Sequence, residues 1–434
     1  MSYNQGSMKT EYVDPNVFVP GQQGRAVFEL DGTKMGYAPN MRLLNLGVVS
    51  NGTHDYNRLL GAIAVIRNIR LLDGRTELSA LRSPAEYLAF KAQQRTNSDN
   101  KSSASWLKRS IIGYDIDQEN GKLNHIFMPG TMNTEADTTT SAYLDLREVF
   151  PILNAMPILP TSIFKNLKIE IEFSGNVGNQ VSVNQSAGAT ANQSVLRPIL
   201  AVDYVDDDRI MMPLVRALKD NGVRWNEVEH DRQHLPGRAA EAAGTQLKRN
   251  KASMGFVGKR VERLLITKQI VDQAVTKIGD EVTGYGNMAS QALLQQQTQI
   301  RLNGKNVFPG FNGVTRPMER LALVSDEYGP CQAYPGSAHY RWSNANVLMK
   351  QGAQDGAAVV DTGKAFSGAL SYDCVRIGAR VADLQIQIAR DIDAGDANAA
   401  NPPSATNLAL NLNLFAEVDK AMAVNADGYR IVYV

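Results

Sequence analysis

The sequence predicts an all-β protein made of two tandem antiparallel domains. Three observations lead to this prediction: frequent Asx-Gly turn pairs, strict alternation of apolar and polar residues in several segments, and a weak internal repeat. The chain of 434 residues is longer than most single domains, and 43% of its residues are apolar. It can therefore bury a substantial core without disulfide bonds.

Nine Asx-Gly pairs are spread along the chain, from Asp31-Gly32 to Asp427-Gly428. A two-residue β-hairpin needs positive φ angles at its centre, and Asn, Asp and Gly adopt them at low cost. The clearest example is the segment 111–128, in which Asn120-Gly121 separates two strand-like runs. These pairs predict a protein rich in hairpins.

Strands with one buried face are predicted where apolar residues recur at every second position. Three segments have this pattern: 166–173, 383–389 and 407–415. An amphipathic helix would place half of these apolar side chains in water, so a strand is favoured. We expect two sets of side chains to point between the sheets of a sandwich: Ile169, Ile171 and Phe173, and Leu410, Leu412 and Leu414.

Helices are expected in three short segments. Residues 83–94 begin with Ser83 and Pro84, residues 141–153 have room for one or two turns, and residues 213–222 run from a proline to a glycine. Two polar stretches, 174–194 and 393–406, have the composition of loops.

An internal repeat relates the two halves. Three pairs of segments carry it, in the same order: 42–48 with 263–269, 69–78 with 300–308, and 166–173 with 407–415. The repeat predicts two copies of a domain of ~200 residues, in which the third pair forms the next-to-last strand of each copy. Two antiparallel domains of eight strands each make a double jelly roll.

This organisation divides the chain into four parts. They are an extended N-terminal arm (1–22), a first jelly roll (23–206), a linker helix (207–223) and a second jelly roll (224–434). The arm is polar and lacks helical periodicity; plain disorder is the alternative. The three aspartates at 206–208 are expected at the start of the linker helix, where negative charge is favourable.

Charge and composition exclude several classes of protein. The chain has 45 basic and 44 acidic residues, so it is not built to neutralise nucleic acid. Two cysteines exclude a disulfide scaffold and a cysteine-rich zinc module. The longest near-apolar run, 59–66, is far shorter than a membrane helix of ~20 residues. The N-terminal sequence lacks the features of a signal peptide, which predicts synthesis in the cytosol.

No metal site is expected. His230 and His234 are four residues apart, but a third ligand is not evident, and Asp231 rather than glutamate follows the first histidine. The Asp-rich segments 115–121 and 391–396 lack the glycine and glutamate of a calcium loop.

No catalytic or cofactor-binding residue is expected either. The segment 284–289 matches G-x-G-x-x-A, but no apolar strand precedes it. The segment 361–366 lacks the first glycine of a phosphate loop. Cys331 and Cys374 have no recognisable catalytic context. The sequence therefore predicts that the protein is not an enzyme.

Three segments carry a resemblance to a known family: 61–91, 144–173 and 412–434. The first holds a strand, a D-G hairpin and a helix start; the second holds "LREVFPIL" followed by "LKIEIEF". The chain resembles the double jelly-roll major capsid proteins of the tectivirus–adenovirus lineage, most closely those of polinton-like viruses and virophages.

The resemblance implies a structural role. The expected function is that of a major capsid protein, whose pseudo-hexagonal trimeric capsomers tile an icosahedral shell around a double-stranded DNA genome. The implied partners are two further copies, neighbouring capsomers, and penton and minor or cement proteins, without sequence-specific nucleic-acid binding. The implied location is the virion capsid, assembled inside the host cell.

Two features bear on alternatives to this role. The stretch 247–263 holds six basic residues against one acid; it is either a patch that faces a genome or minor capsid protein, or a solvated loop followed by a strand. The second reading is favoured, because aromatic residues for base stacking are missing from it. A carbohydrate-binding or receptor-binding jelly-roll protein is the alternative function, but Trp106, Trp225 and Trp342 are scattered. A β-fold enzyme with dispersed catalytic residues is a further alternative.

Overall fold

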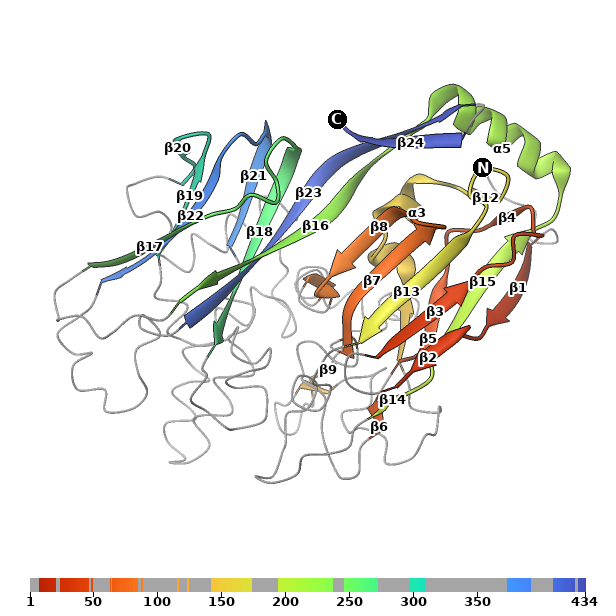
Figure 1. Cartoon of the computed structure of the whole chain (residues 1–434), viewed down its shortest axis with the longest axis horizontal. Helices are drawn as coiled ribbons and strands as arrows, with labels where there is room; N and C mark the ends of the chain where they lie inside the picture. The colour runs from red at the N-terminus through yellow and green to blue at the C-terminus, as the bar shows by residue number, and fades with distance from the viewer. Residues whose placement is uncertain are drawn as a thin grey trace.

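The computed structural model in Figure 1 describes two β-rich halves of the chain. The described residues are 8–20, 24–46, 48–49, 63, 65–84, 87–88, 115–116, 123–124, 142–173, 194–236, 246–271, 297–308, 373–391, 409–425 and 428–434. The halves lie side by side, with the N-terminal half on the right of the view and the C-terminal half on the left.

The N-terminal half contains two facing antiparallel sheets. One has the strand order β1 (Met8–Val13), β15 (Ile199–Val205), β5 (Arg42–Leu46) and β11 (Ala142–Asp145), with the short strands β4 (Gly36–Tyr37) and β12 (Leu159–Pro160) beyond the end of β5. The other has the order β2 (Val17–Val19), β3 (Arg25–Glu29), β13 (Leu167–Phe173), β7 (Ile66–Asp73) and β8 (Thr76–Arg82). Two further pairs are short: β6 (Val48–Val49) with β14 (Ser194–Val195), and β9 (Asp115–Ile116) with β10 (Leu123–Asn124).

The C-terminal half repeats this plan. Its first sheet has the order β16 (Val223–Leu235), β23 (Ala409–Asn425), β18 (Arg260–Val271) and β21 (Asp373–Arg380), and β24 (Gly428–Tyr433) extends it beside the end of β23. Its second sheet has the order β17 (Gln246–Ala252), β22 (Leu384–Asp391), β19 (Gln297–Leu302) and β20 (Lys305–Asn306).

Both halves have the connectivity of a jelly roll. In each, eight strands divide so that the first, eighth, third and sixth in chain order form one sheet, and the second, seventh, fourth and fifth form the other. In the N-terminal half these strands are β1, β3, β5, β7, β8, β11, β13 and β15; in the C-terminal half they run from β16 to β23. The prediction of two tandem eight-stranded antiparallel jelly rolls is confirmed.

The internal repeat is correct in two of its three segment pairs. Residues 42–48 and 263–269 fall on β5 and β18, each the third strand of its jelly roll. Residues 69–78 and 300–308 fall on the fourth and fifth strands, which form a hairpin in both halves. In the second hairpin Asn303 and Gly304 have φ angles of 50° and 79°, as a tight two-residue turn requires.

The third pair is wrong. Strand β13 is the seventh strand of the first jelly roll, but β23, which contains most of 407–415, is the eighth strand of the second. The true counterpart of β13 is β22, whose sequence "LQIQIARD" also alternates. Alternation indicates a strand with one buried face but not its position in the sheet. The alternating segments β13 and β23 therefore resemble each other although they occupy different positions in their jelly rolls.

The expected N-terminal arm is also wrong for its described part. Strand β1 pairs with β15 over six residues, from Met8 opposite Val205 to Val13 opposite Leu200, and β2 pairs with β3. These residues complete the sheets of the first jelly roll, because without β1 the backbone edge of β15 would be unpaired on that side. Residues 1–7 lie outside the described part of the chain.

Helix α5 (Asp208–Asn221) connects the two jelly rolls within the expected linker 207–223, but it starts five residues before the expected Pro213. Asp207 is its N-cap, and its carboxylate accepts a hydrogen bond from the backbone N–H of Arg209. Pro213 lies inside the helix, in its second turn, where it has no backbone N–H to donate to the carbonyl of Arg209. Gly222 ends the helix with φ 64°.

The segment 141–153 holds β11 and two short helical turns, η4 (Leu146–Glu148) and α3 (Pro151–Ala155). The helix expected at 83–94 lies mostly outside the described residues, as do the loops 174–194 and 393–406. Within the described residues, no helix is long and apolar enough to cross a membrane.

The core of the first jelly roll lies between its two sheets. On β13 the alternation is strict: Leu167, Ile169, Ile171 and Phe173 are buried, and the residues between them are half-buried. On β23 Leu412 and Leu414 enter the second core as expected, whereas the side chain of Leu410 is outside the described set. The opposite face of β23 is buried as well, because Asn413 and Phe415 are each 1% exposed. Phe415 is covered on this face by Tyr87 of the first jelly roll.

Candidate functional site: the contact between the two jelly rolls

The most elaborate constellation of side chains lies where the second jelly roll packs on the first. The long strands β16 and β23 extend from the second jelly roll across α3 and β8 of the first (Figure 1), and β16 contacts both of these elements. One continuous buried cluster joins the first core to side chains of the second jelly roll, namely Trp225, Val228, Leu265, Cys374, Phe415, Met422 and Val424. The two jelly rolls therefore share buried apolar surface.

An aromatic group forms the apolar centre of this contact. The ring of Tyr87, from the first jelly roll, lies 5.5 Å from the ring of Phe415 on β23. The imidazole of His230 lies on the same phenylalanine, at 4.8 Å between ring centroids. Tyr87 and Phe415 are each 1% exposed, so burial of these rings holds the two jelly rolls together.

A buried carboxyl group forms the polar centre. Glu227 on β16 is 1% exposed. One of its oxygens accepts a hydrogen bond from Ser79 Oγ on β8, at 2.7 Å, and the other accepts one from Trp225 Nε1, also at 2.7 Å. Burial raises the pKa of Glu227 to about 7, against the opposing effects of the Lys420 charge and these two hydrogen bonds.

A second polar link joins the C-terminal strand to the first jelly roll. Tyr429 on β24 donates its hydroxyl hydrogen bond to Asp73 Oδ2 on β7, at 3.0 Å, and its ring lies 5.1 Å from Phe164. Burial, together with the charge of Asp73, raises the pKa of Tyr429, so the phenol stays protonated and remains a donor. The C-terminal strand thus ties the second jelly roll to the first.

A charged cluster beside this link involves Glu229, Lys259, Lys420 and Tyr433. Tyr433 donates to Glu229 Oε1 at 2.8 Å, Lys420 Nζ is 3.2 Å from the same oxygen, and Lys259 pairs with Glu229 Oε2. Burial by itself would raise the pKa of Glu229, but the two lysines lower it overall. The carboxylate stays ionised and holds β16, β23 and β24 to the loop before β18.

This arrangement bears on the basic stretch 247–263. Lys259 pairs with Glu229, Arg260 with Glu262 and Asp419, and Arg263 with Glu417 at 3.5 Å. These three cations are neutralised within the second jelly roll, which supports the structural interpretation over a genome-facing patch. Residues 247–252 belong to β17, so the stretch is a strand, a turn and a strand rather than a loop followed by one strand.

The two histidines singled out in the sequence lie on β16 and not on a helix. His230 Nε2 lies 3.2 Å from Asn413 Oδ1, and His234 Nδ1 lies 3.0 Å from Asn411 Oδ1, both on β23. Burial lowers the pKa of His230 to about 4, so it is neutral at physiological pH. The described residues contain no group of three His, Cys, Asp or Glu side chains that could hold a metal ion.

Several other sequence features fall outside the described residues: 284–289, 361–366, Cys331, Trp106 and Trp342. Cys374 is buried in the contact between the jelly rolls. Trp225 is 6% exposed, and its indole N–H is used by Glu227, so it is not part of an exposed aromatic platform for sugars.

Sequence reasoning missed the residues that make the contact. Ser79, Tyr87 and Glu227 look like ordinary members of strands or of a helix start. One weak signal was present: Phe415 interrupts the alternation of "NLALNLNLF" with a large apolar residue on the polar face. A strand that becomes apolar on both faces is covered on both faces.

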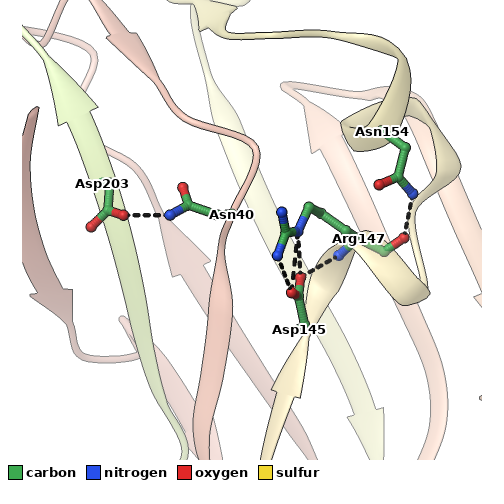
Figure 2. Close-up of polar contacts among 5 residues, drawn as sticks. All are labelled: Asn40, Asp145, Arg147, Asn154 and Asp203. Atoms are coloured by element: carbon green, nitrogen blue, oxygen red, sulfur yellow. Dashed lines mark hydrogen bonds and ion pairs between the residues drawn. The ribbon is translucent and has the colours of Figure 1, made fainter. Parts of the chain in front are cut away.

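A separate polar set lies around the end of β11 in the first jelly roll (Figure 2). Arg147 forms a bidentate ion pair with Asp145 at the end of β11, and Asn154 of α3 donates to the backbone carbonyl of Arg147 at 2.7 Å. Beside it, Asn40 donates to Asp203 on β15. These contacts fix the turn from β11 into α3, and α3 in turn packs against β16.

This architecture is found in solved structures of other proteins, although the sequence itself has no match. No family model and no curated protein sequence matches the chain. Among solved structures, PBCV-1 VP54 fitted into a cryo-EM reconstruction of the virophage Sputnik matches with a TM-score of 0.52 at 13% identity, over 98% of this chain and 97% of that one. The 3.5 Å cryo-EM structure of the Sputnik virophage also gives 0.52, at 10% identity, over 98% and 88%.

The chain has the double jelly-roll fold of viral capsid proteins. A quasi-atomic model of the PBCV-1 virus capsid adds a third match, with a TM-score of 0.50 at 13% identity over 98% of this chain and 96% of that one. The coverage on both sides means that both jelly rolls are shared, with their connection. At identities of 13%, 13% and 10%, these matches show that the chain shares the fold of the three structures.

The two buried titratable groups make a testable pH prediction for this contact. The folded pKa of Glu227 is raised, so its contribution to stability is full below about 4.5 and is lost as the pH rises through about 7. The folded pKa of His230 is lowered, so its contribution is full above about 6.5 and is lost as the pH falls through about 4. The two slopes oppose each other between pH 4.5 and 6.5.

We therefore expect that, in Glu227→Gln, the contribution of His230 to the pH dependence of the free energy of unfolding is no longer cancelled by that of Glu227. In urea titrations, the free energy of unfolding of this variant should rise with pH from 4.5 to 6.5 relative to that of the parent, by up to about 1.4 kcal/mol per pH unit. His230→Gln should change the slope in the opposite direction. Identical pH profiles for the parent and both variants would contradict the burial of these groups.

We also expect chelation of divalent metals to leave the fold unchanged, because the described residues hold no complete ligand set. The measurement is the melting temperature with and without EDTA. A fall of several degrees would reveal a metal site in the rest of the chain or at the histidines of β16.

Proposed function

We propose that this protein is the major capsid protein of an icosahedral double-stranded DNA virus. Its role is assembly and not catalysis. The observation that carries the proposal is the pair of eight-stranded jelly rolls joined by a shared buried contact, in a chain that matches viral capsid structures over almost its whole length. We place the division between the jelly rolls at the linker 207–223, which contains α5.

Three copies of such a chain place six similar domains around one axis. The resulting outline is close to a hexagon, and hexagons tile a shell. A net charge of +1 suits dense packing of many copies, because strong like charge would oppose it. The proposed partners are neighbouring capsomers, penton proteins and minor or cement proteins. The proposed location is the virion, after synthesis in the host cell.

The test is the state of the purified protein in solution. We expect light scattering to give about 142 kDa, for three chains of 47.4 kDa each, with an interface on the order of 2,000 Å² or more per chain. Negative-stain images should show hexagonal particles. A monomer that persists at micromolar concentration would contradict the proposal and would favour a carbohydrate-binding or receptor-binding jelly-roll protein.

A further inference from the structure

The sheet β16-β23-β18-β21 of the second jelly roll is equivalent to the sheet β1-β15-β5-β11 of the first, but the outer faces of the two sheets have different neighbours. In the second jelly roll, the outer face of the sheet β16-β23-β18-β21 carries a row of register partners: His230, Phe415, Leu265 and Cys374. The pair Phe415 and Leu265 is 1% and 0% exposed, respectively, in the cluster that contains Tyr87. This face is therefore covered by the first jelly roll of the same chain.

The equivalent face of the first jelly roll is apolar at the same position. In the repeat that relates β5 to β18, Leu44 corresponds to Leu265; the neighbouring Leu43 and Leu264 both point into their own cores. Leu44 is the register partner of Ile199 on β15, just as Leu265 is the partner of Phe415 on β23. Both Leu44 and Ile199 are half-buried, so part of each side chain is accessible to solvent.

One exposed tyrosine and several half-buried polar side chains surround this pair. Tyr12 on the edge strand β1 lies opposite Ala201 in register and is 69% exposed. Arg42 lies 3.7 Å from Asp203, and its counterpart Arg263 lies 3.5 Å from Glu417 in the second jelly roll, although the two acids are at different register positions. Within the described residues, the buried atoms Arg42 Nε and Asn40 Oδ1 have no hydrogen-bond partner. We name Tyr12, Leu44, Ile199, Asn40 and Arg42 the open face.

We propose that the open face receives a second copy of this chain, whose second jelly roll covers it as the first jelly roll covers Phe415 and Leu265. This inference rests on the proposed function, and it adds the surface by which copies join. The proposal is based on the duplication. The equivalent sheet of each jelly roll carries an apolar pair on its outer face, and within one chain only the pair Leu265 and Phe415 is covered.

The geometry allows such a contact to repeat around a ring. The sheet of β1, β15 and β5 lies at the right-hand end of the molecule in Figure 1, and β17, β19, β20 and β22 lie at the opposite end. A contact between opposite ends is heterologous, so it leaves a free open face on each added copy until the ring closes.

The test is the oligomeric mass of charge variants on the open face. Tyr12→Asp and Ile199→Asp should each raise the dissociation constant of the trimer at least tenfold, or give the mass of a single chain, with an unchanged far-ultraviolet circular dichroism spectrum. Met212→Asp is the matched control, because Met212 is 68% exposed on the linker helix α5 and lies outside both the open face and the second jelly roll. This control should keep the parent mass.

The outcomes separate the two proposals. If the parent protein is a trimer and both folded variants keep its mass and dissociation constant, the open face is not the contact, and the capsid proposal stands. If Ile199→Asp fails to fold, Tyr12→Asp decides alone, because its side chain is exposed on an edge strand. If the parent protein is a monomer, the proposed function fails, and this inference fails with it.

Discussion

Replacing Ile171 with aspartate should leave the first jelly roll unable to fold. Ile171 is 0% exposed on β13, which is hydrogen-bonded to β3 on one side and β7 on the other. A carboxylate at this position has no partner in the core and costs several kcal/mol, a large part of the 5–15 kcal/mol that stabilises a typical domain. Leu412→Asp should have the same effect in the second jelly roll, where Leu412 is also 0% exposed. The measurement is the yield of soluble, folded protein.

The matched control is the neighbouring residue on the opposite face of the strand. Glu170 is half-buried, and its carboxylate lies 2.8 Å from Arg70 on β7. Glu170→Gln removes this partly exposed ion pair and should cost about 1 kcal/mol or less. A soluble, cooperatively unfolding Ile171→Asp protein would show that β13 does not lie in the core between the two sheets.

Phe415→Ala should destabilise the protein by about 3–5 kcal/mol, since it empties a large buried site. The ring of Phe415 lies against Tyr87 of the first jelly roll and His230 of β16, so its loss weakens the contact between the two jelly rolls. The measurement is the urea midpoint of unfolding. Phe18→Ala is the control, because Phe18 is half-buried on the edge strand β2 and should cost less.

A double-mutant cycle with Tyr87→Ala tests the contact itself. Because the two rings are 5.5 Å apart, the single losses should not add, and the coupling should be about 0.5 kcal/mol or more. Additive losses would mean that each ring is stabilised separately within its own jelly roll.

The internal repeat is only partly readable from the sequence. The pairs 42–48/263–269 and 69–78/300–308 were matched correctly, because each contains a specific feature: an Arg-Leu-Leu start in the first and an Asx-Gly hairpin in the second. The pair 166–173/407–415 rested on alternation alone. Any strand with one buried face alternates, so this signal could not distinguish the seventh strand from the eighth.

The candidate site was less accessible to sequence reasoning than the fold. The spacing of the two histidines of β16 is visible in the sequence, but their partners are asparagines of β23, 183 and 177 residues later in the chain. No local sequence pattern marks Glu227, although its hydrogen bond from Ser79 crosses from one jelly roll to the other. Such partners are set by strand pairing and domain packing, which leave no local pattern.

The sequence by itself determined the all-β class, the hairpin turns and the duplication, because turn chemistry and side-chain alternation act over a few neighbouring residues. It also determined which face of β13 is buried. The tertiary structure alone decided that β1 completes the first jelly roll and that β23 is buried on both faces. It also decided that Leu265 is covered while Leu44 is only half-buried. These outcomes depend on contacts between residues far apart in the chain, where one apolar side chain can be covered by any of several surfaces.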